Sequence, residues 1–219
     1  MSKPASLPPH CMYWDLRQTS VVIIGGWNQA IFTPQWVYHH AFACEGDPDT
    51  GDLLLSMGLL NTGGYLADYR CHGVVLVVQP AKLELRPLTL DDAVFDEVEA
   101  TAIRILKALP ETPVEAVGVN VGKEVAPELI DRYYGCADSD RFAAMGFTRR
   151  DLQVWRLFER NEKLMRVMAR QDDQRVALDF NRHIDARNLT AGAVVPKLRG
   201  AFLETREVAT EILEALEAT

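Results

Sequence analysis

The sequence has no apolar run long enough to cross a membrane as a helix. Its longest apolar runs, VVIIGG and GVVLVV, are far shorter than the roughly 20 residues that such a helix needs. The opening stretch, MSKPASLPPHCMYWD, is rich in proline and lacks the apolar segment of a signal peptide. We therefore expect no membrane partner and a cytoplasmic location, with residues 1–18 forming a flexible N-terminal arm.

Cysteine pairs and the usual metal-binding spacings are also missing. The four cysteines are widely separated and include no CxxC pair: Cys11, Cys44, Cys71 and Cys136. In a chain without a secretion signal, this pattern is typical of reduced thiols that serve as small apolar side chains. The histidines show no HxH, HxxxH or HExxH spacing. We therefore expect neither a metal ion nor a cofactor.

Motifs for catalysis and for phosphate binding are absent as well. The sequence contains no G-x-S-x-G motif, no GxGxxG motif and no P-loop. The formal net charge of −8 argues against the concentrated basic face that nucleic-acid binding needs. These absences favour a protein that is not an enzyme and whose partner is not a nucleic acid.

Residues 73–109 show the plan of the fold most clearly. GVVLVV is apolar at successive positions, as in a strand buried on both faces, and KLELR alternates, as in a strand with one polar face. After Pro87, LTLDDAVFDEVEATAIRILKAL has an apolar stripe at helical spacing. Two strands and a helix that covers them form a compact core unit.

Apolar runs and alternation predict further strands at residues 19–24, 53–60, 65–71, 114–121, 152–159, 163–169 and 175–180. Thr33 and Pro34 predict the start of a short helix over residues 34–43. A second long amphipathic helix is predicted over residues 195–218, with Pro196 in its first turn. Residues 152–169 have an alternative as one continuous helix, because their apolar and charged residues also suit helical spacing.

The two halves of the chain follow one order, in which several strands precede a long amphipathic helix. We therefore predict an α+β fold with a single antiparallel or mixed, twisted sheet of about seven to nine strands. Two long helices are expected on one face, and the two halves are expected to be pseudo-related. The other face stays partly open as a binding surface. Because no linker rich in Gly, Ser or Pro divides the halves, residues 19–219 are predicted to form a single α+β domain.

Aromatic residues gather just after the first predicted strand, where a Gly-Gly turn leads into the short helix. Trp and Tyr dominate the energetics of protein interfaces. The candidate partner-binding residues are therefore Trp27, Asn28, Phe32, Trp36 and Tyr38. The alternative is a small aromatic core that seals one end of the sheet.

A second candidate site consists of charged residues on predicted strands. Lys82, Glu84 and Arg86 share one face of the alternating strand, and Arg182 lies in a polar cluster near the predicted end of a later strand. Together these four side chains could bind a phosphorylated ligand on the open sheet face. The alternative is a solvated face with a cross-strand ion pair.

The segment WNQAIFTPQWVYHHAF resembles uncharacterised bacterial proteins that carry Asn-x-Ala-Ile-Phe-x-Pro-x-Trp after an N-terminal strand. The matching positions are Asn28, Ala30, Ile31, Phe32, Pro34 and Trp36. A weaker similarity covers the helix at residues 91–109, residues 112–121, and the last strand and helix, which resemble a sporadically distributed family of conserved hypothetical proteins. The resemblance implies no activity, and the sporadic distribution implies a defence-linked or mobile gene neighbourhood.

These observations lead to the expectation of a non-enzymatic protein-binding or assembly subunit of a bacterial system that is defence- or toxin-linked. Its partner is another protein or a further copy of the chain. The expectation rests on the missing catalytic motifs, the open sheet face and the aromatic residues. The alternative is an enzyme or sensor for a phosphorylated small molecule or nucleotide bound on the open sheet face.

Overall fold

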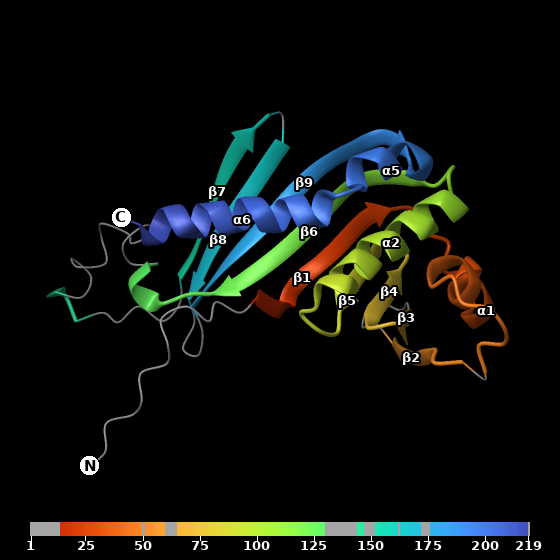
Figure 1. Cartoon of the computed structure of the whole chain (residues 1–219). Coiled ribbons are helices and arrows are strands. Elements are labelled where there is room, and N and C mark those ends of the chain that lie inside the picture. Colours follow the sequence, from red (N-terminus) through yellow and green to blue (C-terminus); the bar gives the residue numbers. More distant parts are fainter. Residues whose placement is uncertain are drawn as a thin grey trace, which may run out of the picture.

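The computed structural model describes residues 14–49, 51–59, 65–129, 144–146, 152–161, 163–171 and 176–218. These residues form one antiparallel sheet of nine strands, with the long helices on one of its faces (Figure 1). The strand order is β2-β3-β4-β5-β1-β6-β9-β8-β7. The predicted α+β class with a single antiparallel sheet is therefore confirmed.

Two meanders flank a central pair of strands. The central strands, β1 (Trp14–Gly25) and β6 (Pro113–Glu124), pair with each other. One meander consists of β2 (Leu54–Leu59), β3 (Tyr65–Cys71), β4 (Val74–Gln79) and β5 (Lys82–Pro87). The other consists of β7 (Leu152–Arg160), β8 (Lys163–Gln171) and β9 (Val176–Thr190).

The first strand begins earlier than the sequence pattern predicts. β1 starts at Trp14 rather than at Thr19, so residues 14–18 belong to the sheet and not to the predicted arm. A register shift between Asp15 and Ser20 interrupts the pairing of β1 with β6. Because such a bulge breaks the alternation of side chains, this part of the strand is hard to recognise in the sequence. The rest of the predicted arm, residues 1–13, lies outside the described residues.

Residues 152–169 form a hairpin and not a helix. β7 and β8 pair antiparallel with Leu157 opposite Arg166, and Asn161 in the connection has a φ of +52°. In β8, Met165, Val167 and Ala169 are buried. Their spacing of two residues is the period of a strand with one face against a core.

The helices before β6 lie close to the predicted positions. η1 (Gln29–Ile31) leads into α1 (Pro34–Trp36) and η2 (Val37–Ala41), which occupy most of the predicted helix at residues 34–43. The Thr33 hydroxyl accepts a hydrogen bond from the Trp36 amide at 3.2 Å, as expected of an N-cap. α2 (Asp92–Ala108) is the long helix predicted after Pro87. None of the described helices is both long and apolar enough to span a bilayer.

The single helix predicted at the C-terminus is instead two helices, α5 (Ala191–Leu198) and α6 (Ala201–Glu217). Gly200 between them has a φ of +72°, a left-handed conformation that ends a helix. The amide of Ala191 donates to the carbonyl of Thr112 at 2.8 Å, which fixes the start of α5 upstream of the predicted start. Pro196 therefore lies in the second half of α5 and not in a first turn.

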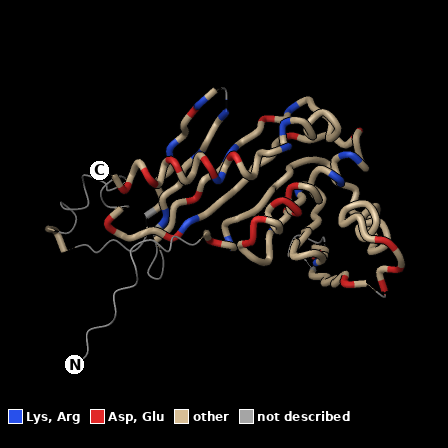
Figure 2. The backbone as a smooth tube through the Cα atoms, viewed as in Figure 1, with Lys and Arg blue, Asp and Glu red and all other residues tan. Residues whose placement is uncertain are grey.

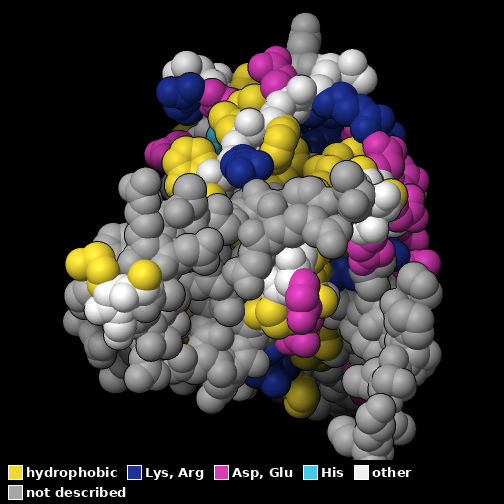
Figure 3. Space-filling view, turned by 90° about the vertical axis from the view of Figure 1, so that its left-hand side faces the viewer, with side chains coloured by type: hydrophobic (Ala, Val, Ile, Leu, Met, Phe, Trp, Pro, Cys, Tyr) yellow, Lys and Arg dark blue, Asp and Glu magenta, His cyan; other side chains and the backbone are white. Residues whose placement is uncertain are grey.

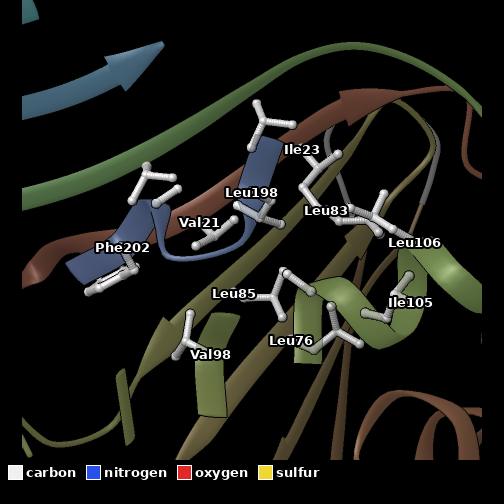
Figure 4. Packing of buried hydrophobic residues seen from close by; sticks show 14 of the residues in the cluster. Val21, Ile23, Leu76, Leu83, Leu85, Val98, Ile105, Leu106, Leu198 and Phe202 are labelled. Atoms are coloured by element: carbon white, nitrogen blue, oxygen red, sulfur yellow. The ribbon is translucent and has the colours of Figure 1, made fainter. Parts of the chain in front are cut away.

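The main core fills the space between the sheet and the long helices. Figure 4 shows side chains of β1, β4 and β5 meeting those of α2, α5 and α6: Val21, Ile23, Leu76, Leu83, Leu85, Val98, Ile105, Leu106, Leu198 and Phe202. Phe95 of α2 stacks on Phe202 of α6, with ring centroids 5.2 Å apart. Glu99 of α2 accepts hydrogen bonds from the amides of Gly200 and Phe202, at 2.6 and 3.0 Å. One long helix thus caps the other, and both lie on the same face of the sheet.

Candidate functional site

The face of the sheet that the described helices leave uncovered is hollowed into a groove of about 500 Å³. The groove crosses six strands, from β5 through β1, β6, β9 and β8 to β7. Its lining is mostly polar: Arg17, Gln18, Ser20, Glu84, Asn120, Gln153, Trp155, Arg166, Met168, Asp179 and Asn181. The volume is in the range of small-ligand sites, whereas the lining is more polar than in most of them.

The floor of the groove is a chain of hydrogen-bonded polar side chains from the three central strands. Asn181 donates to the amide oxygen of Asn120 at 2.6 Å, and Asn120 donates to the hydroxyl of Ser20 at 3.1 Å. On either side of Asn120, β6 carries a glycine. A Cβ at Gly118 would lie 2.8 Å from the Asn181 amide nitrogen, and one at Gly122 would lie 2.3 Å from the Cβ of Gln18. The glycines thus make room for the neighbouring polar side chains.

Gly122→Ala is expected to lower the free energy of unfolding by about 1–3 kcal/mol, because the added methyl group forces β1 and β6 apart. Chemical denaturation of both proteins measures the difference. Gly26→Ala is the matched control, since a Cβ at Gly26 meets nothing within 4 Å. Equal stabilities of the two variants would contradict the close approach at Gly122.

Charged side chains of the groove are held in local pairs. Arg170 forms an ion pair with Asp179, and Arg17 bonds Asp15 at 3.2 Å and Glu124 at 3.3 Å. The guanidinium of Arg166 lies over the Trp155 ring, 5.2 Å from its centroid. A guanidinium on an indole face leaves edges that can still donate hydrogen bonds.

The predicted ligand-binding residues are only partly brought together. Lys82, Glu84 and Arg86 share the grooved face, as predicted. Lys82 donates to the Glu84 carboxylate at 2.9 Å, and the Arg86 guanidinium lies 3.8 Å from the same carboxylate. Arg182 lies on the opposite face. β9 continues to Thr190 instead of ending at Phe180, and the alternation along it places Arg182 on the helix side, opposite buried Val119. The prediction that Arg182 joins Lys82, Glu84 and Arg86 in one ligand-binding site is therefore wrong.

Arg182 lines a separate cleft of about 180 Å³ between the β7–β8 hairpin and α6. It bonds Glu204 of α6 at 2.7 Å, and Lys163 forms an ion pair with the same carboxylate. The hydrogen bond from Lys163, aided by Arg182, holds the pKa of Glu204 below its ordinary value against the opposing effect of burial. A network of ion pairs at this cleft therefore joins the hairpin to α6.

Glu204→Gln is expected to lower the free energy of unfolding by about 1 kcal/mol at pH 7. The loss is small because the ion pairs are partly exposed to solvent. A carboxylate with a lowered folded pKa stabilises the fold above its unfolded pKa of about 4.3. That contribution is lost as the pH falls through the folded pKa. The difference between the two proteins in urea denaturation should therefore vanish at low pH. Glu207→Gln, at an exposed position of the same cleft, serves as the control.

The aromatic residues predicted to bind a partner are mostly buried, which corrects that prediction. Trp27, Phe32 and Tyr38 are only 4%, 3% and 7% exposed. Asn28 is exposed, but its side chain accepts from the Ala30 amide at 3.1 Å as the cap of η1. The edge-on contact of Phe32 with half-buried Trp36, at 5.0 Å between centroids, completes an aromatic core at one end of the sheet. The caps turn the chain so that the rings face inward.

Most of the exposed large hydrophobic side chains of the described residues lie instead on the two edge strands. On β2, Leu54, Leu55 and Met57 are 65%, 41% and 65% exposed. On β7, Trp155, Leu157 and Phe158 are also exposed. On the side of the molecule where β7 lies, hydrophobic and basic side chains are next to each other (Figure 3). The sequence carries a signal for β2 in LLLSMGLL, a strand pattern with no charged residue.

The chain was also compared with known proteins. No family model matches it, and no curated protein matches it.

Proposed function

We propose that the protein is a non-enzymatic assembly subunit that binds a second copy of itself through the edge strand β2. The observation that carries this proposal is an edge strand with exposed apolar side chains and no charge (LLSMGL). Edge strands of soluble proteins usually carry charges or prolines that block pairing with another chain. An uncharged, apolar edge is the kind that pairs with a further strand.

Charge favours β2 over β7 as the self-pairing edge. β7 and its partner β8 carry one acidic residue, Glu159, and five basic ones: Arg156, Arg160, Lys163, Arg166 and Arg170. Figure 2 shows Lys and Arg along this hairpin. Two copies of it would repel each other. Next to β2, Asp68 and Arg70 of β3 bond each other at 3.2 Å, so two copies of this edge meet without excess charge.

An antiparallel β2–β2 pair about a two-fold axis extends one sheet through both copies. Such an interface is isologous, which means that both copies contribute the same surface. The apolar side chains of β2 in one copy therefore pack against those of β2 in the other. In this arrangement the chain consists of two related halves, each a strand meander closed by a long helix, and β2 and β7 are their corresponding outer edges. One outer edge then makes the dimer, and the other remains for a different partner.

The experiment that tests the assembly function is sedimentation equilibrium of the full chain over micromolar concentrations. The proposal predicts a monomer–dimer equilibrium. A strict monomer at all concentrations would contradict it.

The second candidate function is binding of a phosphorylated small molecule or nucleotide, and the polar groove favours it. Within one groove, Arg17 and Arg166 supply guanidinium groups and Trp155 supplies an aromatic face. Guanidinium groups suit phosphate, and an indole suits a planar base. A thermal-shift screen with nucleotides and polyphosphates, with and without magnesium, tests this function. A shift that is lost in Arg166→Ala supports it, and no shift with any ligand rules it out.

The bacterial, cytoplasmic and defence- or toxin-linked setting is also part of the proposal. Its support is the resemblance at residues 28–36 to sporadically distributed bacterial proteins. Affinity purification of the chain together with its operon neighbours tests this setting. Specific retention of a neighbour is the expected result.

A further inference from the structure

Three potential metal ligands that are scattered in the sequence meet at one place in the fold. Cys44 follows η2, whereas Cys71 ends β3 and His72 begins the turn to β4. The two sulfur atoms are 3.8 Å apart, and the Cys44 sulfur is 3.7 Å from the Nε2 atom of His72. All three ligand atoms lie within 4.8 Å of one another. Sequence spacing does not reveal this cluster, because 27 positions separate the two cysteines.

The two distances from the Cys44 sulfur match the edges of a tetrahedral zinc site, and the third pair of ligand atoms lies within 4.8 Å. Zinc lies about 2.3 Å from a cysteine sulfur and about 2.0–2.1 Å from a histidine nitrogen. Tetrahedral angles then require about 3.8 Å between two sulfur atoms and about 3.6 Å between sulfur and nitrogen. A hydrogen bond between thiols would account for the sulfur–sulfur distance alone. A second hydrogen bond, between Cys44 and His72, would account for the sulfur–nitrogen distance, so metal titration has to distinguish the two arrangements.

One ligand and the residue before another have a left-handed backbone. Ala43, just before Cys44, has a φ of +54°, and His72 has a φ of +49°. His72 and Gly73 form the two-residue turn between β3 and β4, in which both residues have a positive φ, so the turn fixes where the His72 side chain starts. His39 fixes the Cys44 backbone further, since its Nδ1 bonds the Cys44 carbonyl at 2.9 Å. Its Nε2 bonds Gln35 at 2.7 Å, so His39 positions a ligand and is not one.

The surroundings of the cluster suit a soft divalent cation. Cys71 is buried and Cys44 is half-buried, so an ion between them is largely shielded from solvent. The negative charge of Asp52 acts on Cys71, which favours a cation nearby. Thiolate ligands select zinc over calcium and magnesium.

We propose that Cys44, Cys71 and His72 bind one Zn²⁺ ion, with a solvent molecule as the fourth ligand. The ion ties the segment after η2 to the β3–β4 turn, and so fastens the aromatic core to the sheet. This site is independent of the β2 edge and of the groove.

The test is metal titration of the reduced full chain after treatment with a chelator. Cobalt(II) is the first probe, because tetrahedral thiolate-bound cobalt absorbs in the visible and near-ultraviolet range. One equivalent of cobalt should bind and be displaced by zinc. At a free zinc concentration about 100 times Kd, Tm should rise by about 5–10 °C.

Variants assign the ligands. Cys44→Ser and Cys71→Ser should abolish the thiolate absorption, and His72→Asn should weaken binding at least about tenfold. Asn tolerates the left-handed conformation, so His72→Asn keeps the turn and the fold even if a buried serine at position 71 does not. Cys136→Ser and His40→Asn are the controls and should bind cobalt as the unchanged chain does.

Three results would overturn the proposal. One is the failure of the reduced, folded chain to bind cobalt or zinc. Another is full binding that persists in both Cys44→Ser and His72→Asn. The third is a Cys44–Cys71 disulfide that survives reductant and excludes the metal, which mass spectrometry detects as a loss of two hydrogen atoms.

Discussion

Met57→Lys is expected to convert the β2-paired dimer into a monomer. In the proposed interface each copy buries the Met57 side chain against the other copy, and each lysine would instead bring an unpaired charge into an apolar contact. Loss of two buried methionine side chains alone corresponds to about 3 kcal/mol or more. This predicts at least about 100-fold weaker dimerisation. Sedimentation equilibrium measures it directly, and circular dichroism confirms that the variant is folded.

Leu157→Lys is the matched control for that variant. Leu157 is 54% exposed on the other edge strand, against 65% for Met57, so both changes place a lysine at an exposed apolar position of an edge. The Leu157→Lys chain should dimerise as the unchanged chain does. Dissociation by Leu157→Lys, with a persistent dimer in Met57→Lys, would place the interface on β7 and contradict the β2 pairing.

Phe202→Ala is expected to lower the free energy of unfolding by about 3–5 kcal/mol. Phe202 is buried and stacks on Phe95, and the Arg206 guanidinium lies 4.6 Å from the Phe95 ring centroid. Truncation leaves a cavity between α2 and α6 and removes the main apolar contact between them. Guanidinium denaturation with a two-state analysis gives the difference.

Leu203→Ala, one position further along α6, is the control for this change. Leu203 is exposed, so its truncation should alter stability by no more than about 0.5 kcal/mol. A similar loss in both variants would mean that α6 does not pack through Phe202 as described.

Much of the fold is predictable from local pattern. The alternation of KLELR and the apolar run GVVLVV predict β5 and β4, and the stripe after Pro87 predicts α2. The missed parts have local causes. A bulge hides the start of β1, the polar residues of β9 beyond Phe180 look like a turn although they pair with β6, and a left-handed Gly200 divides the last helix.

The candidate sites were less predictable, because they depend on which strands become neighbours. Asn120 and Asn181 are unremarkable in sequence and become the groove floor only because β1, β6 and β9 lie side by side. The register along β9 likewise decides that Arg182 faces α6. For Trp27 and Phe32, the sequence does not show whether the rings face the core or the solvent. The turn capped by Asn28 directs them into the core. Cys44 and Cys71 meet only through tertiary contacts.

Hydrogen–deuterium exchange of the β2 amides, at two protein concentrations, tests the central proposal most directly. An unpaired edge strand has every second amide open to solvent, and pairing with another strand protects those amides. Pairing through β2 predicts that the outward amides of residues 54–59 exchange slowly at concentrations where the dimer forms and quickly after dilution, while β7 is unaffected. Exchange of residues 54–59 at the same rate at both concentrations would contradict assembly through this strand.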